Sequence, residues 1–156
     1  MSAIPTPDFK NYDPKIADAL IKANDSLTGL PGFLGIKIVD FGPGTLRAEA
    51  GVRDELLTPF GNIHGGVMAA ICDHVLGCVC YPVMKPGQWA ATTEFKLNYV
   101  APVTSGALVA EASILSLTRT TAVVRIHVSN EGRLACIAQG TVLIRDPRPK
   151  QPTARS

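Results

Sequence analysis

The chain has 156 residues, which suits one domain with a sizeable hydrophobic core and is short for two. Hydrophobic residues make up 46% and charged residues 18%, as in soluble globular proteins, and the net charge of +2 is too small to indicate a nucleic-acid partner. We therefore expect a single fold that does not bind nucleic acid.

Residues 1–12 form a predicted N-terminal extension. They contain no basic stretch followed by an apolar segment, which a secretion signal would need. No apolar run elsewhere reaches the roughly 18 residues of a membrane span without a proline, a glycine or Asp73. The sequence accordingly predicts a cytoplasmic protein that is not bound to a membrane.

Residues 13–27 are predicted to form a short amphipathic helix that packs on the core as a lid. Asp13 is suited to cap its start and Pro14 to occupy its first turn. From Phe33 the apolar residues change to a period of two, which is typical of strands. A hairpin is therefore predicted over residues 33–52, around a Gly-Pro-Gly turn.

A central helix is predicted from Gly65 to Tyr81, after a loop over residues 56–66, and Pro82 ends it. Bulky residues at i, i+4 spacing form a stripe along this helix: Val67, Ile71, Val75 and Val79.

Four β-like runs fill residues 88–145 and predict a meander, separated by turns at 102–106, 117–120 and 130–132. Polar and apolar residues alternate along 121–128, so each strand has one buried face and one wetter face.

Six strands in one antiparallel sheet leave a single apolar face, and only the central helix is long and apolar enough to cover it. We predict an α+β fold in which a six-stranded antiparallel sheet curls around that helix, with a short N-terminal helix, as one domain over residues 13–146. Residues 147–156 lack apolar content and are predicted to be a disordered tail.

The four cysteines lie in apolar segments without the spacing of a zinc site or of a secreted disulfide framework: Cys72, Cys78, Cys80 and Cys136. We interpret them as reduced core residues. The sequence predicts no metal site.

Asp73 is the only formally charged residue between Leu56 and Met84, and it lies inside the predicted central helix. Removing a carboxylate from water is costly unless partners or a function offset the cost. We interpret Asp73 as a catalytic carboxylate in a pocket; an aspartate that only caps or pairs is the structural alternative. Small residues flank it in the helix, which indicates that something approaches it closely: Gly66, Ala69, Ala70, Gly77 and Cys80.

The sequence His64-Gly65-Gly66 lies where the loop becomes the helix, so backbone N–H groups without intrahelical partners point outward there. Glycine has no Cβ to obstruct a carbonyl, so this helix end is a candidate oxyanion hole. The alternative is that the two glycines only allow tight packing of the helix on the sheet.

Asp73 follows Gly65 by about 12 Å along one helix, at about 1.5 Å per residue. One helix cannot aim both groups at one carbonyl, whereas two antiparallel copies can. This predicts a homodimer whose active sites cross its interface. A carboxylate placed there either attacks the bound carbonyl or deprotonates a water that attacks it.

The segment Pro59–Ala70 (PFGNIHGGVMAA), with Asp73 after it, resembles the signature of hotdog-fold thioesterases of the phenylacetate-degradation (PaaI-like) type. Thr92–Val103 (TTEFKLNYVAPV) and Gly132–Cys136 (GRLAC) are similar to later segments of that family, so the resemblance runs from about Phe33 to Ile144.

The resemblance implies hydrolysis of acyl- or aroyl-coenzyme A by a dimer, often paired into tetramers, without a metal or redox cofactor. It implies that the Gly65 N–H polarises the carbonyl, that His64 shapes the loop, and that Asp73 of the facing subunit is nucleophile or general base. Gly66 belongs to the same substrate-binding loop.

Two positions depart from the family pattern. Many relatives have Asn or Gln where this chain has Thr58, and Asn62 is a candidate to compensate. Some relatives have a hydroxyl residue where this chain has Gly77, and Thr92 is the nearest match among those that draw the hydroxyl from the next strand. Thr58, Asn62 and Gly77 are therefore candidate substrate-binding residues, and Thr92 a candidate catalytic one.

Other polar and aromatic residues have plainer interpretations. His74 and His127 are predicted to be structural, and Trp89 and Tyr99 to lie in the core or an interface. Basic residues that could meet coenzyme A phosphates are as readily explained as scattered surface charge: Arg119, Arg125, Arg145, Arg148 and Lys150.

Two other functions fit the same fold. The first is a non-catalytic module that binds or senses acyl-coenzyme A. The second is hydration or dehydration of enoyl thioesters, whose branch uses an Asp and a His five residues apart, a spacing absent around Asp73.

Overall fold

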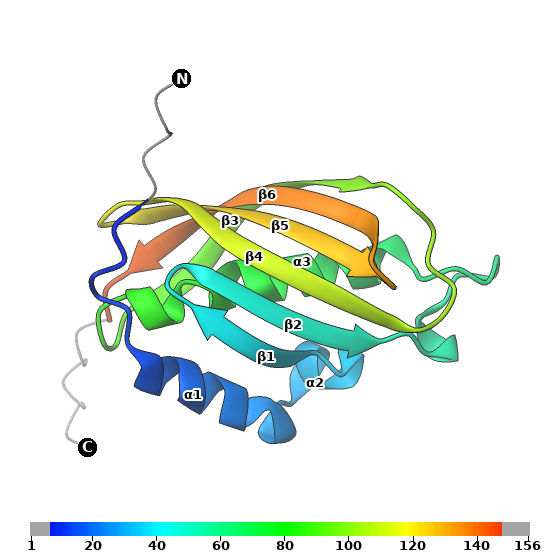
Figure 1. Ribbon diagram of the computed structural model, residues 1–156, viewed down its shortest axis with the longest axis horizontal. Helices are drawn as coiled ribbons and strands as arrows, with labels where there is room; N and C mark the ends of the chain where they lie inside the picture. Colours follow the sequence, from blue (N-terminus) through cyan, green and yellow to red (C-terminus); the bar gives the residue numbers. More distant parts are fainter. Residues whose placement is uncertain (1–6, 148–156) are drawn as a thin grey trace, which may run out of the picture.

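The computed structural model describes residues 7–147, and Figure 1 shows them as a curved antiparallel sheet around one long helix. The six strands are β1 (Lys37–Gly42), β2 (Thr45–Gly51), β3 (Trp89–Tyr99), β4 (Ala107–Leu117), β5 (Thr121–Asn130) and β6 (Arg133–Arg145). The helices are α1 (Pro14–Lys22), α2 (Gly29–Leu34) and α3 (Gly65–Cys78), with short 3₁₀ turns η1 (Ala23–Ser26), η2 (Asp54–Leu56) and η3 (Tyr81–Val83). The predicted α+β architecture is confirmed.

The strand order is β1-β2-β4-β5-β6-β3, and every neighbouring pair is antiparallel. β4, β5 and β6 form a meander, but β3 pairs with β6 at the far edge, so the chain crosses over between β3 and β4. The prediction of one meander over all four strands is wrong for β3. Alternation along a strand reports which face is buried, whereas strand neighbours are decided by pairing between distant segments.

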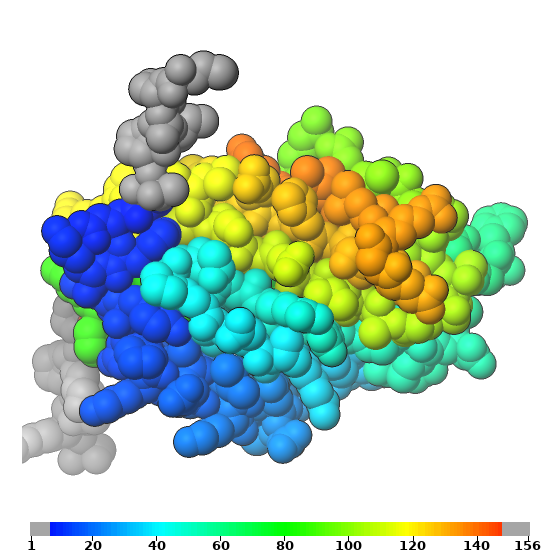
Figure 2. All heavy atoms as spheres, in the orientation of Figure 1, coloured from blue at the N-terminus to red at the C-terminus, as the bar shows by residue number. Residues whose placement is uncertain are grey.

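The core lies between α3 and the concave face of the sheet. The buried face of α3 carries Met68, Ile71, Cys72, Val75 and Leu76, and strand residues such as Val124 and Ile126 meet it. Burying one such aliphatic side chain contributes about 1.5–3 kcal/mol relative to leaving it exposed. Figure 2 shows the opposite, outer face, where the atoms of α1, β2 and β4 form a continuous surface.

The helical stretch Gly65–Val83 has the length and mean hydropathy, 1.5, of a membrane span, and half of the span is buried inside the protein. The core helix of a globular protein has the same composition, because it is apolar toward a sheet that wraps it. Within this stretch α3 ends at Cys78, and Pro82 lies in η3, so the regular helix is shorter than predicted.

The N-terminal segment differs from the prediction in two ways. α1 has the predicted cap, with Asp13 accepting a hydrogen bond from the Lys15 N–H at 2.9 Å, but it ends at Lys22 and continues as η1. There the side chain of Asn24 bonds both backbone groups of Ile38, which turns the chain toward β1.

The second difference is that Phe33 belongs to α2 and not to a strand. α2 ends at Gly35, whose φ of 67° is left-handed, and β1 begins only at Lys37. The i, i+3 and i+4 spacing of Leu30, Phe33 and Leu34 is the helical signal behind this element.

Part of the predicted extension is packed on the domain. Phe9 and Tyr12 contact the core, and the Tyr12 hydroxyl donates a hydrogen bond to the Phe41 carbonyl at 3.3 Å. The rest of the predicted extension, residues 1–6, and all of the predicted disordered tail except Pro147 lie outside the described residues.

Candidate active site

The loop-to-helix junction at His64 is fixed by three hydrogen bonds. The His64 N–H donates to the Leu56 carbonyl, and the His64 carbonyl accepts from the Val67 N–H, both at 2.9 Å. The imidazole Nδ1 accepts from the Gly66 N–H, also at 2.9 Å, so His64 is the N-cap of α3. The Gly65 N–H has no acceptor among residues 7–147, which leaves it free to bind a ligand.

Gly65 also lies close to a side chain of the sheet. A Cβ on Gly65 would lie 2.7 Å from the hydroxyl oxygen of Tyr99 and 2.8 Å from its Cζ. The neighbour of Gly65 is thus one side chain at the end of β3, which would have to move to admit a Cβ. A Cβ on Gly66 would approach only the His64 imidazole, at 3.0 Å.

Two hollows flank the start of α3. One, of about 450 Å³, is lined by Asn62, Gly65, Met68 and Tyr99 together with residues 100–102. The other, of about 330 Å³, lies toward α2 and is lined by His64, Gly66 and apolar side chains that include Phe33. The free N–H of Gly65 therefore stands at an open part of the surface.

Asp73 lies in a third hollow, of about 550 Å³, with Thr92 and Thr93 of β3 and Ala69 and Ala70 of α3. The structure thus brings Asp73 and Thr92 together, but it leaves Asp73 on a different part of α3 from Gly65. The carboxylate is exposed to solvent in the single chain. The reason is that the sheet covers only one face of α3, and Asp73 lies on the uncovered side.

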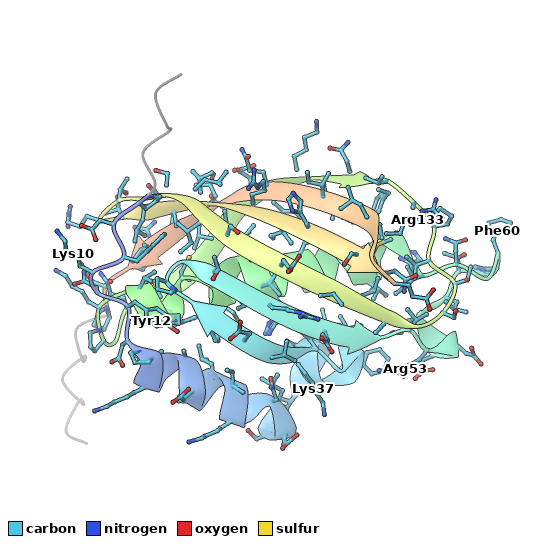
Figure 3. All side chains as sticks on the ribbon, viewed as in Figure 1. Lys10, Tyr12, Lys37, Arg53, Phe60 and Arg133 are labelled. Carbon is cyan, nitrogen blue, oxygen red and sulfur yellow. The ribbon has the colours of Figure 1, made fainter. Side chains whose placement is uncertain are left out.

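Two other predicted site residues, Thr58 and Asn62, bond to each other in the loop before α3. The Thr58 hydroxyl donates to Asn62 Oδ1 at 3.1 Å and accepts from the Phe60 N–H at 3.2 Å, while Asn62 Nδ2 donates to the Ile63 carbonyl at 3.3 Å. Only Asn62 of this pair lines a hollow beside α3. Phe60 is 93% exposed at the tip of the loop, pointing away from the domain (Figure 3).

Gly77 lies one turn after Asp73, and a Cβ added there would meet nothing within 4 Å. The position is therefore open in the single chain, and Gly77 does not line the hollow that contains Asp73.

Residues 60–137 match the family model described as the thioesterase superfamily. This chain belongs to that superfamily. It is 32% identical over 113 residues to the "proofreading thioesterase EntH" of Klebsiella pneumoniae, covering 71% of this chain and 82% of the relative. It is 26% identical over 121 residues to a "1,4-dihydroxy-2-naphthoyl-CoA hydrolase" of Listeria monocytogenes, covering 77% of this chain and 98% of the relative.

Solved structures of thioesterases share the fold. A thioesterase of Haemophilus influenzae superposes with a TM-score of 0.79 at 25% identity, covering 85% of this chain and 94% of that one. The PaaI protein of the Escherichia coli phenylacetic acid degradation operon superposes with a TM-score of 0.76 at 18% identity, covering 85% and 96%. The predicted hotdog fold and PaaI-like resemblance are confirmed, and the protein is a thioester hydrolase.

Two of the thioesterase's ionisable groups lie one turn apart beside the acid. Burial lowers the pKa of His74, and the neighbouring charge of Asp73 acts in the opposite direction. The His74 Nε2 lies 3.7 Å from the Cys78 Sγ, and burial raises the pKa of the Cys78 thiol to about 12. His74 is thus held toward its neutral form, and Cys78 remains a thiol at neutral pH.

The other cysteines and the arginines lie away from the Gly65 N–H. All four cysteines are free, as predicted, and Cys72, Cys80 and Cys136 are buried. Arg125 lies on the outer face of β5 in a hollow with His127, Arg119 lies in the turn before β5, and Arg145 ends β6. Arg148 and Lys150 lie outside the described residues.

Within residues 7–147 no three His, Cys, Asp or Glu side chains are grouped closely enough to share a metal ion. Tyr99 is the contact residue that sequence analysis missed at this site. It was predicted only as a core or interface residue, because no local pattern connects a strand end with the start of a helix far along the chain.

Proposed function

We propose that this thioesterase hydrolyses acyl- or aroyl-coenzyme A to the free acid and coenzyme A. The observation that carries the proposal is the free Gly65 N–H at the start of α3, beside an open hollow, in a chain of the thioesterase superfamily. The Listeria relative is itself named a hydrolase of a coenzyme A thioester, which supports this substrate class.

The Gly65 N–H binds the carbonyl oxygen of the thioester and stabilises the negative charge that develops on it. The positive end of the α3 dipole lies behind this group and adds to the effect. His64 holds the junction in place, because its imidazole and carbonyl occupy the next two N–H groups of the helix, those of Gly66 and Val67. Gly65 alone is then left to bind the substrate oxygen.

Asp73 of the facing subunit supplies the second half of the chemistry. Its carboxylate either attacks the carbonyl carbon, giving a mixed anhydride that water then cleaves, or takes a proton from the water that attacks directly. In both routes the carbon–sulfur bond breaks and the thiolate leaves as coenzyme A. Thr92 shares the hollow of Asp73, which suits a role in holding that water.

The proposal requires a homodimer, because Gly65 and Asp73 are separated along one rigid helix. Two features of the single chain favour a second copy as the partner. Asp73 is exposed beside β3, and β3 is the last strand of the sheet, so its outer backbone groups have no strand partner within residues 7–147. A second chain running antiparallel along this edge places each Asp73 near the other chain's Gly65. Pairing of such dimers gives the tetramer that the resemblance implies.

The roles of the remaining candidates follow from this arrangement. Asn62 and Gly66 line the hollows on either side of the Gly65 N–H, where the substrate chain passes. Thr58 acts by holding Asn62 in position. Gly77 leaves space beside Asp73 for the facing subunit or the substrate.

The test is a thiol-release screen with short, medium, long and aromatic acyl-coenzyme A substrates, run on the wild type and on Asp73→Asn. Removing a general base or nucleophile lowers kcat by about 10²- to 10⁴-fold. Asp40→Asn, at an exposed carboxylate of β1, is the matched control and retains wild-type activity.

Two outcomes contradict the proposal. If Asp73→Asn releases thiol as fast as the wild type from every active substrate, Asp73 has no part in the chemistry. If the wild type binds acyl-coenzyme A but turns over none of the panel, the protein is the non-catalytic binding module instead.

A further inference from the structure

We infer that the Tyr99 hydroxyl is a second hydrogen-bond donor to the carbonyl oxygen that the Gly65 N–H binds. The inference rests on the proposed function, and it deepens it by adding a residue that touches the substrate. It is carried by the closeness of the Tyr99 hydroxyl to Gly65 in the hollow they share and by the absence of a partner for that hydroxyl within residues 7–147.

The contact places a hydroxyl directly beside the oxyanion donor. The Tyr99 oxygen lies 2.7 Å from the point where a Cβ of Gly65 would stand, so the hydroxyl is close to Gly65 and would have to move to admit a side chain there. Tyr99 ends β3, and its backbone is held in register with Cys136 of β6. The ring is therefore presented to α3 by the sheet and not by a loop.

Several other polar groups of this region already have partners. The Gly66 N–H donates to His64 Nδ1, and one of the two amide N–H groups of Asn62 donates to the Ile63 carbonyl. The Thr58 hydroxyl donates to Asn62. The Tyr99 hydroxyl has no hydrogen-bond partner among residues 7–147; the residue is 56% exposed and lines the hollow.

A carbonyl oxygen has two lone pairs and binds two donors when it becomes an oxyanion. Of the donors at the start of α3, only the Gly65 N–H is free, so the second must come from another element. Tyr99 is a side chain that oxyanion holes use, and it reaches this point without disturbing any bond within the protein. Its hydroxyl therefore acts on the substrate and not on the fold.

The test compares Tyr99→Phe with the wild type, and Tyr12→Phe serves as the matched control because its hydroxyl bonds Phe41 at the opposite side of the molecule. Tyr99→Phe lowers kcat by about 10²-fold, as loss of an oxyanion donor does. KM rises by no more than about fivefold, the loss of one hydrogen bond to the ground-state carbonyl, because most of the interaction develops only in the transition state. The melting temperature stays at the wild-type value, since the hydroxyl bonds nothing in the folded chain.

A pair of coenzyme A analogues separates the hydroxyl from the ring. One is a ketone, with CH₂ in place of the sulfur and the carbonyl retained; the other is a thioether without the carbonyl. Calorimetry shows that Tyr99→Phe binds the ketone about fivefold more weakly, the loss of one hydrogen bond, and binds the thioether as the wild type does.

The inference is overturned if Tyr99→Phe retains the wild-type kcat and ketone affinity, or if both analogues weaken equally, which would show a packing role for the ring. The analogue measurements need no turnover. A wild type that cleaves no thioester therefore contradicts the proposed function, while the ketone and thioether still decide the role of Tyr99.

Discussion

β1 and β3 are the two edge strands of one sheet, and they differ in what covers their outer edges. α1 lies alongside β1, where Asn24 bonds both backbone groups of Ile38 and Tyr12 bonds the Phe41 carbonyl (Figure 1). β3 pairs with β6 on one side only, and its large side chains at the two ends, Trp89 and Tyr99, are 43% and 56% exposed.

An edge strand presents unpaired N–H and C=O groups that can pair with another chain, and most proteins protect such edges. This thioesterase protects the β1 edge with its own N-terminal segment and leaves the β3 edge open beside Asp73. We interpret the closed edge as a contribution to stability and the open edge as the place for association. The four predictions below test that division.

The largest effect is expected at the Gly65 N–H, which lies close to Tyr99 at the end of β3. Gly65→Pro removes the N–H at the first position of α3, where proline is tolerated, and His64 already has the extended backbone, with ψ of 134°, that a residue before proline needs. We expect kcat to fall by about 10²- to 10³-fold while the far-ultraviolet circular dichroism stays unchanged.

Gly65→Ala is the matched control, because it adds a Cβ against Tyr99 and keeps the N–H. It loses less activity than Gly65→Pro. Equal losses in the two variants would show that crowding, and not the missing donor, causes the defect.

Mixing two inactive proteins tests whether the open edge joins two chains. In a heterodimer of Asp73→Asn and Gly65→Pro, one site carries both substitutions and the other carries neither. Random pairing after co-expression should restore about a quarter of the wild-type activity per chain. Activity is measured by thiol release, and the dimer by sedimentation. Heterodimers that form without any recovery would place Asp73 and Gly65 of one chain in the same site.

At the closed edge we expect a loss of stability without a loss of chemistry. Asn24→Ala removes two hydrogen bonds to Ile38, at 2.8 and 2.9 Å, and leaves both backbone groups of Ile38 without those partners. The free energy of unfolding should fall by about 1–3 kcal/mol, measured by urea titration, with kcat unchanged.

Asn24→Asp keeps an acceptor for the Ile38 N–H but sets a carboxylate oxygen against the Ile38 carbonyl, so it should also be less stable than the wild type. A fall in kcat without a fall in stability would contradict the division between the two edges.

The smallest expected effect is a pH dependence of the free energy of unfolding, caused by His74 next to Asp73. Burial lowers the pKa of His74, so just below the ordinary histidine pKa of about 6.5 the unfolded chain binds a proton that the folded chain does not. His74 therefore makes the free energy of unfolding fall as the pH decreases through this range, and the loss stops once the folded form is also protonated.

His74→Gln should remove this part of the pH profile, measured as the difference in unfolding free energy between variant and wild type from pH 7.5 to about pH 5. Asp73→Asn should enlarge it, because the charge of Asp73 raises the pKa of His74. Parallel profiles in all three proteins would rule out His74 as the cause.

The sequence by itself determined the central helix, the antiparallel strands and the helix start at His64. Their signals are apolar periodicity, a cap and glycines, which act between residues a few positions apart. It also singled out Asp73 as the one charge in an apolar stretch, and the segment Pro59–Ala70 with Asp73 after it revealed the resemblance to PaaI-like hotdog thioesterases. α2 was missed because the helical spacing of Leu30, Phe33 and Leu34 covers barely one turn of its six residues, GLPGFL, and is interrupted by glycines and a proline.

Only the tertiary structure decided which strand lies at the open edge, how exposed Asp73 is, and which side chain lies against Gly65. Each depends on contacts between distant segments: β3 with β6, α3 with the sheet, and Tyr99 with Gly65. Local patterns state which face of an element is apolar but not what covers it, because the covering partner is chosen by packing across the whole domain.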